Sequence, residues 1–274
     1  MQQINNKCSK SIFICCLYMT GFLLTETGIF GQESYLSELL PGTESSFHHL
    51  NLESSKITGK SHFRYETLIK EGTRFVVEKN ENTKTDGEVF TRKTLWFDAD
   101  SGIPKWYKEE DLRKEFRITN SYTRQIMHTR LVEDGQVLEF KTDLSTDNAV
   151  PFEVVIFFLR KYLKQILQNK KFSFTLFIPL LAIELEKKGL PRSMSMISMW
   201  AEPQEKTRKD TPLGVMNAHT ILVSPQSGLL RALLPWEKTH FEFTFAAASP
   251  YHLLQFKAGK TRHVLTSLIL PEDS

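Results

Sequence analysis

The first half of the chain alternates between hydrophobic and polar residues with a period of two, which is typical of strands that bury one face. Short polar turns such as Asp86-Gly87 and Asp134-Gly135 separate these segments. The predicted strands cover residues 62–66, 73–78, 89–97, 105–107, 115–120, 124–132 and 136–142. Because no segment with helical periodicity intervenes, the pattern predicts an antiparallel meander rather than alternating strands and helices.

A different pattern begins after Pro151. From Phe158 onward, hydrophobic residues recur at positions i, i+1, i+4 and i+5, which predicts an amphipathic helix near residues 152–168. Its hydrophobic side carries Phe158, Leu159, Tyr162, Leu163, Ile166 and Leu167, and its polar side includes Arg160, Lys161 and Lys164. An apolar stretch at residues 172–178 and a segment of ambiguous type at residues 180–187 follow the helix.

Strand patterns return in the last third of the chain. The predicted strands cover residues 193–201, 215–223, 229–234, 239–246, 253–257 and 263–270. The plan is therefore a meander, one inserted helix and a second meander. It predicts a mainly β protein, an antiparallel β-roll or open half-barrel, formed by a single domain over residues 56–270. Residues 32–55 are mixed and polar, and we interpret them as a lead-in with a short helical turn.

The N-terminal segment has the pattern of an export signal. Lys7 and Lys10 precede an apolar run at residues 12–24, which is short for a membrane span. We predict a signal peptide over residues 1–31 with cleavage between Gly31 and Gln32, and an exported protein that is periplasmic or associated with the cell envelope. Gly28 is the rival cleavage site, and an uncleaved, membrane-tethered form is the alternative.

The three cysteines, Cys8, Cys15 and Cys16, all lie in this N-terminal segment. A cleaved chain would therefore have no disulfide, no cysteine nucleophile and no thiolate metal ligand. The formal net charge is +3 for 274 residues and no basic cluster is apparent, which argues against nucleic acid as a partner. The chain has 20 Phe and only 13 Gly, a composition that suits long strands around a wide apolar interior.

The C-terminal half resembles a known family. The similarity rests on residues 211–214, on Ala218-His219, on Phe243-Thr244-Phe245, on Ser249-Pro250-Tyr251 and on residues 254–259 and 265–268, with residues 96–104 and 150–152 upstream. In these motifs the chain is similar to the exported bacterial proteins of the domain of unknown function DUF3108. The resemblance spans residues 56–270 and implies an envelope location and an antiparallel β-architecture, but no established activity.

Motifs that would indicate a particular chemistry are weak. No His pair has the helical spacing of a zinc protease, and His48-His49 is more simply a solvated pair, so we predict no metal and no cofactor. His219 lies in the segment that resembles the family and is the histidine of most interest. Residues 98–109 fail as a calcium loop, since Gly102 and Ile103 occupy its fifth and sixth positions, and a β-turn at Asp98 is the better account.

Nucleophilic serine chemistry is equally unsupported, because no G-x-S-x-G motif occurs. Carboxylates such as Glu109-Glu110-Asp111 and the pair Glu184 and Glu186 are most simply solvated charges. We therefore predict no catalytic residue from the sequence. A hydrolase would need acids or histidines that converge only in the fold, at least one of them with a perturbed pKa.

The aromatic residues are the remaining candidates for a ligand site. The candidate lining residues are Trp96, Phe158, Tyr162, Trp236, Phe241, Phe243 and Phe245. A filled core explains them most simply, and a groove for an acyl chain is the alternative. Likewise, the polar side of the helix could rest on an anionic membrane surface, although packing over the sheet is the commoner use.

These observations together predict a non-catalytic, exported envelope protein of the DUF3108 type. It would bind an apolar or polymeric ligand, such as a lipid, or an envelope protein partner. The alternative is a periplasmic hydrolase whose carboxylates or histidines meet only in the folded chain.

Overall fold

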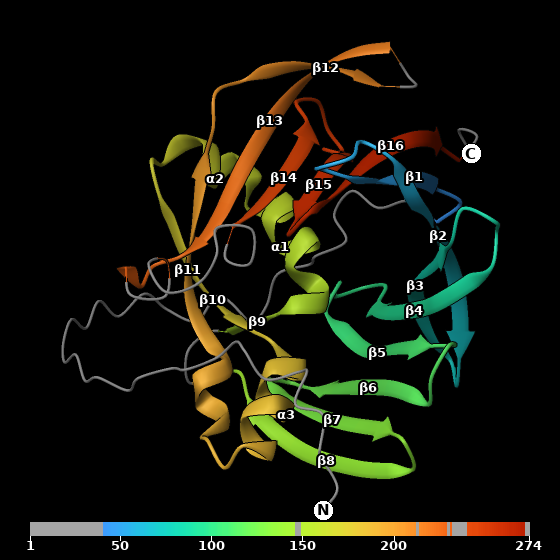
Figure 1. The fold of residues 1–274 in the computed structure, drawn as a ribbon, viewed down its shortest axis with the longest axis vertical. Helices are drawn as coiled ribbons and strands as arrows, with labels where there is room; N and C mark the ends of the chain where they lie inside the picture. The colour runs from blue at the N-terminus through green and yellow to red at the C-terminus, as the bar shows by residue number, and fades with distance from the viewer. Residues whose placement is uncertain (1–40, 146–148, 212–213, 229–230, 232–239, 272–274) are drawn as a thin grey trace, which may run out of the picture.

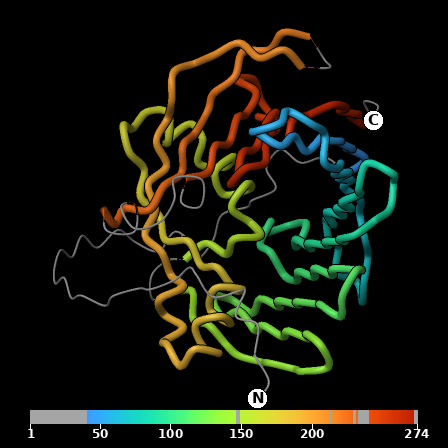
Figure 2. Tube along the Cα trace, viewed as in Figure 1, coloured from blue at the N-terminus to red at the C-terminus, as the bar shows by residue number. Residues whose placement is uncertain are grey.

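The computed structural model describes residues 41–145, 149–211, 214–228, 231 and 240–271. These residues form one large, mainly β structure in which a continuous sheet curves around a central helix (Figures 1 and 2). The sheet is open, because its strand order runs from β8 at one edge to β9 at the other. The predicted mainly β class and open, half-barrel-like architecture are confirmed.

The first meander contains β1 to β8, and each strand pairs antiparallel with the next. The strands are β1 (Glu44–Asn51), β2 (Ile57–Lys70), β3 (Thr73–Thr83), β4 (Val89–Asp98), β5 (Pro104–Asp111), β6 (Phe116–Thr123), β7 (Ile126–Glu133) and β8 (Gln136–Asp143). Strands β2 to β8 match the segments predicted from the alternation. The alternation succeeds here because each strand buries one face against the helix and solvates the other.

The predicted helix is present but interrupted. After β9 (Ala149–Pro151) come a short 3-10 turn η1 (Phe152–Val154), α1 (Val155–Lys161) and α2 (Leu163–Gln168). The two α-helices meet at Tyr162, whose φ of −89° and ψ of 8° depart from helical values. None of the helices among the described residues is long and apolar enough to cross a membrane.

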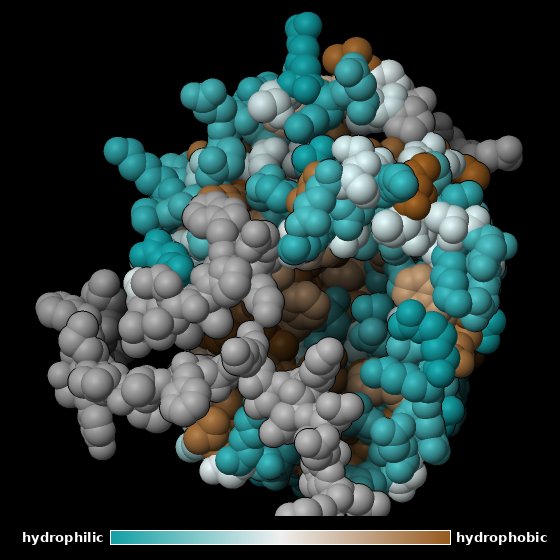
Figure 3. All heavy atoms as spheres, in the orientation of Figure 1, coloured by the Kyte–Doolittle hydropathy of each residue, from teal (hydrophilic) through white to brown (hydrophobic). Residues whose placement is uncertain are grey.

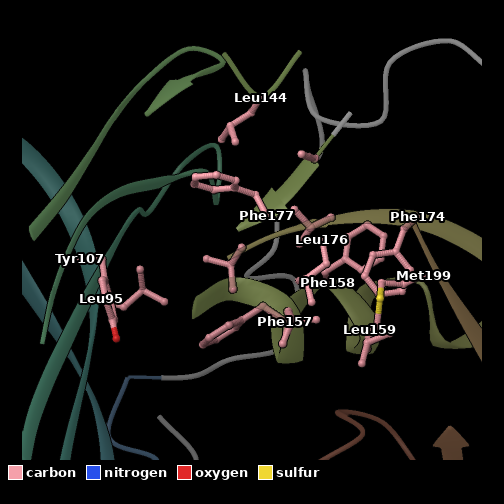
Figure 4. Packing of buried hydrophobic residues seen from close by; sticks show 14 of the residues in the cluster. Leu95, Tyr107, Leu144, Phe157, Phe158, Leu159, Phe174, Leu176, Phe177 and Met199 are labelled. Carbon is pink, nitrogen blue, oxygen red and sulfur yellow. The ribbon is translucent and has the colours of Figure 1, made fainter. Parts of the chain in front are cut away.

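Helix α1 fills the space that the sheet encloses. Figure 4 shows Phe157 directed toward Leu95 and Tyr107 of the first meander, while Phe158 lies beside Phe174 and Met199 on the opposite side. The Phe157 and Phe97 ring centroids are 4.7 Å apart, and those of Phe158 and Phe174 are 5.1 Å apart. The helix is therefore buried on several sides by both halves of the sheet.

The second half completes the sheet. It contains β10 (Phe172–Phe177), α3 (Pro179–Lys187), a 3-10 turn η2 (Arg192–Ser195), β11 (Met196–Pro203), β12 (Thr207–Thr211), β13 (Gly214–Pro225), β14 (Phe241–Ala246), β15 (Leu253–Ala258) and β16 (Thr261–Ile269). The ambiguous segment is thus a helix, and β12 was not predicted because its sequence is polar throughout. β9 and β10 pair in parallel, which makes the sheet mixed. The predicted strand at residues 229–234 lies outside the described residues except for Arg231.

One assignment is wrong at the N-terminal end. Residues 44–51, assigned above to a polar lead-in, form β1, which pairs with β2 on one side and with β16 on the other. Its inward positions are Phe47 and His49, and both are buried. The segment looked polar because one of its two buried positions is a histidine and most of the other residues are polar. The β1–β16 pairing, which we call the seam, joins the two meanders.

A glycine allows close packing beside the seam. A Cβ atom built on Gly59 of β2 would lie 2.6 Å from the carbonyl oxygen of Thr83 and 3.3 Å from Nδ1 of His49. We expect Gly59→Ala to lower the free energy of unfolding by about 1–3 kcal/mol, because backbone would have to move. Denaturant unfolding measures this. Gly228→Ala is the control, because among the described residues no atom beyond the neighbouring backbone lies within 4 Å of the added methyl. An equal effect of the two substitutions would contradict the explanation.

Candidate functional site

A cavity of about 60 Å³ lies between α1 and the seam. Its lining comprises Thr43, Ser45, Phe47, Phe63, Tyr65, Glu78, Glu153, Ile156, Phe157, Arg160, His252, Leu253, Leu265 and Leu268. These residues come from β1, β2, β3, β15, β16 and the η1–α1 segment, so both meanders and the helix contribute. On the face drawn in Figure 3 the molecule is hollowed near its centre, and hydrophobic residues form much of the floor.

Local geometry explains why these side chains converge. Glu153, Ile156, Phe157 and Arg160 are spaced by three, four and seven residues, which places them on one face of a helix. Leu265 and Leu268 of β16 are three residues apart, and in a regular strand such side chains point to opposite faces. Both nevertheless line the cavity. The register shifts between Ser46 and Phe47 of β1, which pair with Ser267 and Leu265, so Thr266 of β16 is the extra residue of a β-bulge.

One wall of the cavity is apolar. Phe47 and Phe63 meet edge to face, with ring centroids 5.5 Å apart. Phe47 and Leu265 belong to a small core cluster beneath the seam, and Leu268 packs against this cluster. Tyr65 and Phe157 belong to the main core. The cavity thus lies where the two cores meet without filling the space between them.

The opposite wall is polar and hydrogen-bonded. The Tyr65 hydroxyl donates to Oε2 of Glu78, its direct partner on the neighbouring strand, at 2.6 Å. Oε1 of Glu153 accepts hydrogen bonds from the Tyr122 hydroxyl and from Nδ2 of Asn120. These bonds hold two carboxyl groups against the cavity. Burial raises the pKa of Glu78, although Tyr65 and Arg160 act against it, and burial also raises the pKa of Glu153.

A histidine completes the polar wall. Burial, followed by the positive charge of Arg160, lowers the pKa of His252 to about 4, so the imidazole is neutral at pH 7. Its Nε2 is buried and has no hydrogen-bond partner among the described residues. A buried polar atom without a partner costs roughly 1–3 kcal/mol, which a polar ligand group could recover.

A second cluster of polar residues lies beside the cavity, at the seam. The His49 and His263 rings, which face each other across β1 and β16, are 4.2 Å apart. The Ser61 hydroxyl donates to Oδ1 of Asn82 at 2.6 Å and therefore accepts a hydrogen bond from Nε2 of His49. Because His49 donates rather than accepts, Ser61 is not arranged as an activated nucleophile.

The aromatic residues predicted to line a ligand site do not line this cavity. Phe158, Tyr162, Phe243 and Phe245 are buried in the main core, and Phe241 is partly buried against it. Trp96 lies on the outer face of β4, because its neighbours Leu95 and Phe97 point inward. Trp96 therefore does not share a lining with the buried aromatic residues, and a ligand role for each of them stays a prediction. Trp236, Gly31 and Gln32 lie outside the described residues.

Four residues of the polar wall were not predicted from the sequence: Glu78, Glu153, Arg160 and His252. Arg160 was assigned to the exposed arc of the helix, but it is buried and borders the cavity. The available signal was the alternation on β2 and β3, which places Tyr65 and Glu78 on the same face as the buried Val76. Arg160 had no such signal, because the hydrophobic pattern of a helix does not show whether a sheet also covers its polar side.

The other candidates behave as ordinary structural groups. Oδ1 of Asp98 accepts hydrogen bonds from the backbone N–H of Ser101 at 2.8 Å and from its hydroxyl at 2.7 Å, and the Ser101 bonds lower the pKa of Asp98. This confirms the β-turn. Glu110 and Asp111 pair with neighbouring cations. His219 lies on β13 opposite Phe245. Within the described residues, no group of three or more His, Cys, Asp or Glu side chains could hold a metal.

Comparison with known proteins gives no family. No family model matches the sequence, and no curated protein matches it. The resemblance to DUF3108 therefore remains a prediction.

Three solved structures are similar to the chain, with sequence identities of 11%, 8% and 7%. A beta-barrel-like protein of the domain of unknown function DUF1849 from Brucella abortus gives a TM-score of 0.44 and covers 83% of this chain and 95% of its own. A candidate exported protein with a YmcC-like fold from Bacteroides fragilis gives 0.35, covering 88% and 99%. A candidate lipoprotein from Parabacteroides distasonis gives 0.34, covering 89% and 100%. At these TM-scores no function is carried from these proteins to this chain.

Proposed function

We propose that the chain is an exported, non-catalytic cell-envelope protein that binds a lipid-like molecule with a polar end group. The observation that carries the proposal is the cavity with two chemically different walls. The apolar wall of Phe47, Phe63 and Leu268 suits an acyl chain, and the polar wall suits its end group. The export pattern of residues 1–31 and the resemblance to DUF3108 support the location.

The size of the cavity limits what enters it. A water molecule occupies about 30 Å³ of liquid, so a cavity of about 60 Å³ holds only the end of a ligand. The remainder of the molecule would lie outside the cavity. His252 and the two glutamates would exchange hydrogen bonds with the end group, and the neutral imidazole would gain a partner for Nε2.

Filling the cavity should prevent binding. Ser45 stands opposite Phe63 on β2 and Leu268 on β16, both of which line the cavity, so a larger side chain at position 45 enters it. We expect the exported protein, purified from a bacterial periplasm, to retain a lipid-sized mass in native mass spectrometry. In Ser45→Phe the fraction of protein that carries this mass is expected to fall at least tenfold, because the phenylalanine ring occupies the cavity.

The matched control is Ser54→Phe, which adds the same ring at an exposed turn and should retain the ligand. Thermal unfolding of both variants separates occlusion of the cavity from loss of the fold. A wild-type protein that carries no extractable molecule, or a Ser45→Phe variant that is folded and still loaded, would refute the proposal.

The alternative is a periplasmic hydrolase, favoured by one specific observation. Glu78, Glu153 and His252 converge on one cavity, and each has a perturbed pKa. Against it, hydroxyl and amide groups hold both carboxyl groups, and no activated nucleophile borders the cavity among the described residues. The extracted molecule distinguishes the two functions. A whole lipid supports binding, whereas a cleaved product that becomes whole in Glu153→Gln supports hydrolysis.

A further inference from the structure

The outer face of the first meander carries a pair of tryptophans. Trp96 on β4 and Trp106 on β5 are direct cross-strand partners, with ring centroids 5.1 Å apart. Phe75 continues the aromatic row at 5.5 Å from Trp96. All three rings are partly exposed. Outward positions of an antiparallel sheet are usually polar, so three adjacent aromatic rings on this face need an explanation.

Two hollows border this pair. One, of about 290 Å³, is lined by both tryptophans, Thr94 and Lys108, among others. The other, of about 470 Å³, is lined by Trp106, Thr119, Ser121 and His128, among others. Trp106 is common to both hollows, which together we call the tryptophan trough. Short hydroxyl side chains on the central strands create the depressions between longer charged neighbours.

Most of the charges along the trough are paired. Lys108 lies 2.8 Å from Glu110, Arg92 lies 2.9 Å from Glu81, and Arg130 lies 3.1 Å from Glu139. Lys79 also pairs with Glu66. Within the described part of the chain two lysines have no such pair: Lys141, which lines the larger hollow, and Lys70, whose Nζ lies 5.5 Å from the centroid of the Trp96 ring. The surface therefore offers little uncompensated positive charge to a polyanion.

We propose that the tryptophan trough binds sugar rings of a neutral glycan chain. The C–H face of a sugar packs against the electron-rich face of an indole. Its hydroxyl groups exchange hydrogen bonds with Thr119, Ser121, His128 and the paired charges. An acyl chain fits this surface poorly, because hydroxyl groups lie beside the rings. The site is on the face opposite to the cavity and does not depend on the function proposed for it.

Binding of defined oligosaccharides tests the proposal. The probes are cellohexaose and chitohexaose, both neutral, with heparin as the polyanion, added to the full-length protein in isothermal titration calorimetry. We expect at least one neutral hexasaccharide to bind and Trp106→Ala to weaken its affinity at least tenfold. Trp200→Ala is the matched control, since Trp200 is also partly exposed on a strand and has a lysine, Lys171, 5.6 Å from its ring.

A second variant distinguishes loss of the binding site from loss of the fold. Thr119→Tyr places a ring in the larger hollow at a strand position where tyrosine is favourable, and it should abolish binding while the protein remains folded. The proposal is overturned if neither neutral hexasaccharide binds, if heparin alone binds, or if Trp106→Ala and Trp200→Ala weaken binding equally.

Discussion

Replacing Phe158 by alanine is expected to lower the free energy of unfolding by about 3–5 kcal/mol, because it removes a buried ring and leaves a cavity. Phe158 is 1% exposed and lies within the core around α1. Its ring centroid is 4.8 Å from that of Tyr162 and 5.1 Å from that of Phe174, so the helix loses contacts with β10 as well as its own neighbour. Urea unfolding followed by circular dichroism measures the change.

Phe152→Ala provides the comparison, since Phe152 lies six residues earlier and is 38% exposed. We expect it to cost about 1 kcal/mol or less, because much of its ring already contacts solvent. If the two substitutions have equal effects, α1 is not the centre of a packed core. A small effect of Phe158→Ala with an unchanged m-value would also contradict the packing described above.

Acidification is expected to lower the free energy of unfolding through the two histidines of the seam, His49 and His263. Burial, and then the proximity of His49, lowers the pKa of His263 from 6.5 to about 4, and burial also lowers the pKa of His49. Between pH 6.5 and 4 the unfolded chain therefore binds protons that the folded chain does not, and stability falls as the pH falls. For His263 alone the full loss is about 3 kcal/mol, at 1.36 kcal/mol per pKa unit.

Two carboxyl groups act in the opposite direction. The pKa values of Glu78 and Glu153 are raised, so the folded state takes up their protons at higher pH than the unfolded state and gains stability on acidification. The net slope of the wild type combines both effects with that of His252, whose pKa is also lowered to about 4 and which acts in the same direction as His263.

Comparison with a variant isolates the histidine contribution. In His263→Phe the new ring can still stack on Phe256, as His263 does at 5.4 Å, but it cannot be protonated. We expect the unfolding free energy of this variant to fall less than that of the wild type between pH 6.5 and 4. His128→Phe, on the outer face of β7, makes the same substitution away from the seam and is the control. Equal slopes for the wild type and His263→Phe would show that the His49–His263 pair does not carry the pH dependence.

Much of the architecture follows from local patterns in the sequence. Alternation along residues 62–142 predicted strands β2 to β8 and their antiparallel order, because neighbouring strands joined by short turns pair with each other. The spacing after Pro151 predicted the helix, because its apolar side must be buried. Both features depend on residues close in the chain, so they can be recognised without knowledge of the remainder.

The candidate site was decided by contacts between residues far apart in the chain. Pairing of Glu44–Asn51 with Thr261–Ile269 creates the seam, and the bulge at Ser46 and Phe47 brings Leu265 and Leu268 to one cavity. Alternation shows which residues share a strand face, but it specifies neither the partner strand nor the register.

Arg160 and Trp96 both show that a local pattern does not decide which side chains are buried. Arg160 is buried although the pattern placed it in solvent, and Trp96 lies outside although its type suggested the interior. The helical pattern placed Arg160 toward solvent, but sheet on more than one side of α1 buries it. The aromatic character of Trp96 suggested an interior site, but Leu95 and Phe97 take the inward positions of β4 and leave Trp96 outside. The sequence by itself determined strands β2 to β8, the helix that follows Pro151 and most strands of the second meander, together with their order. Only the tertiary structure decided which faces meet, because that choice depends on the simultaneous packing of both meanders around one helix.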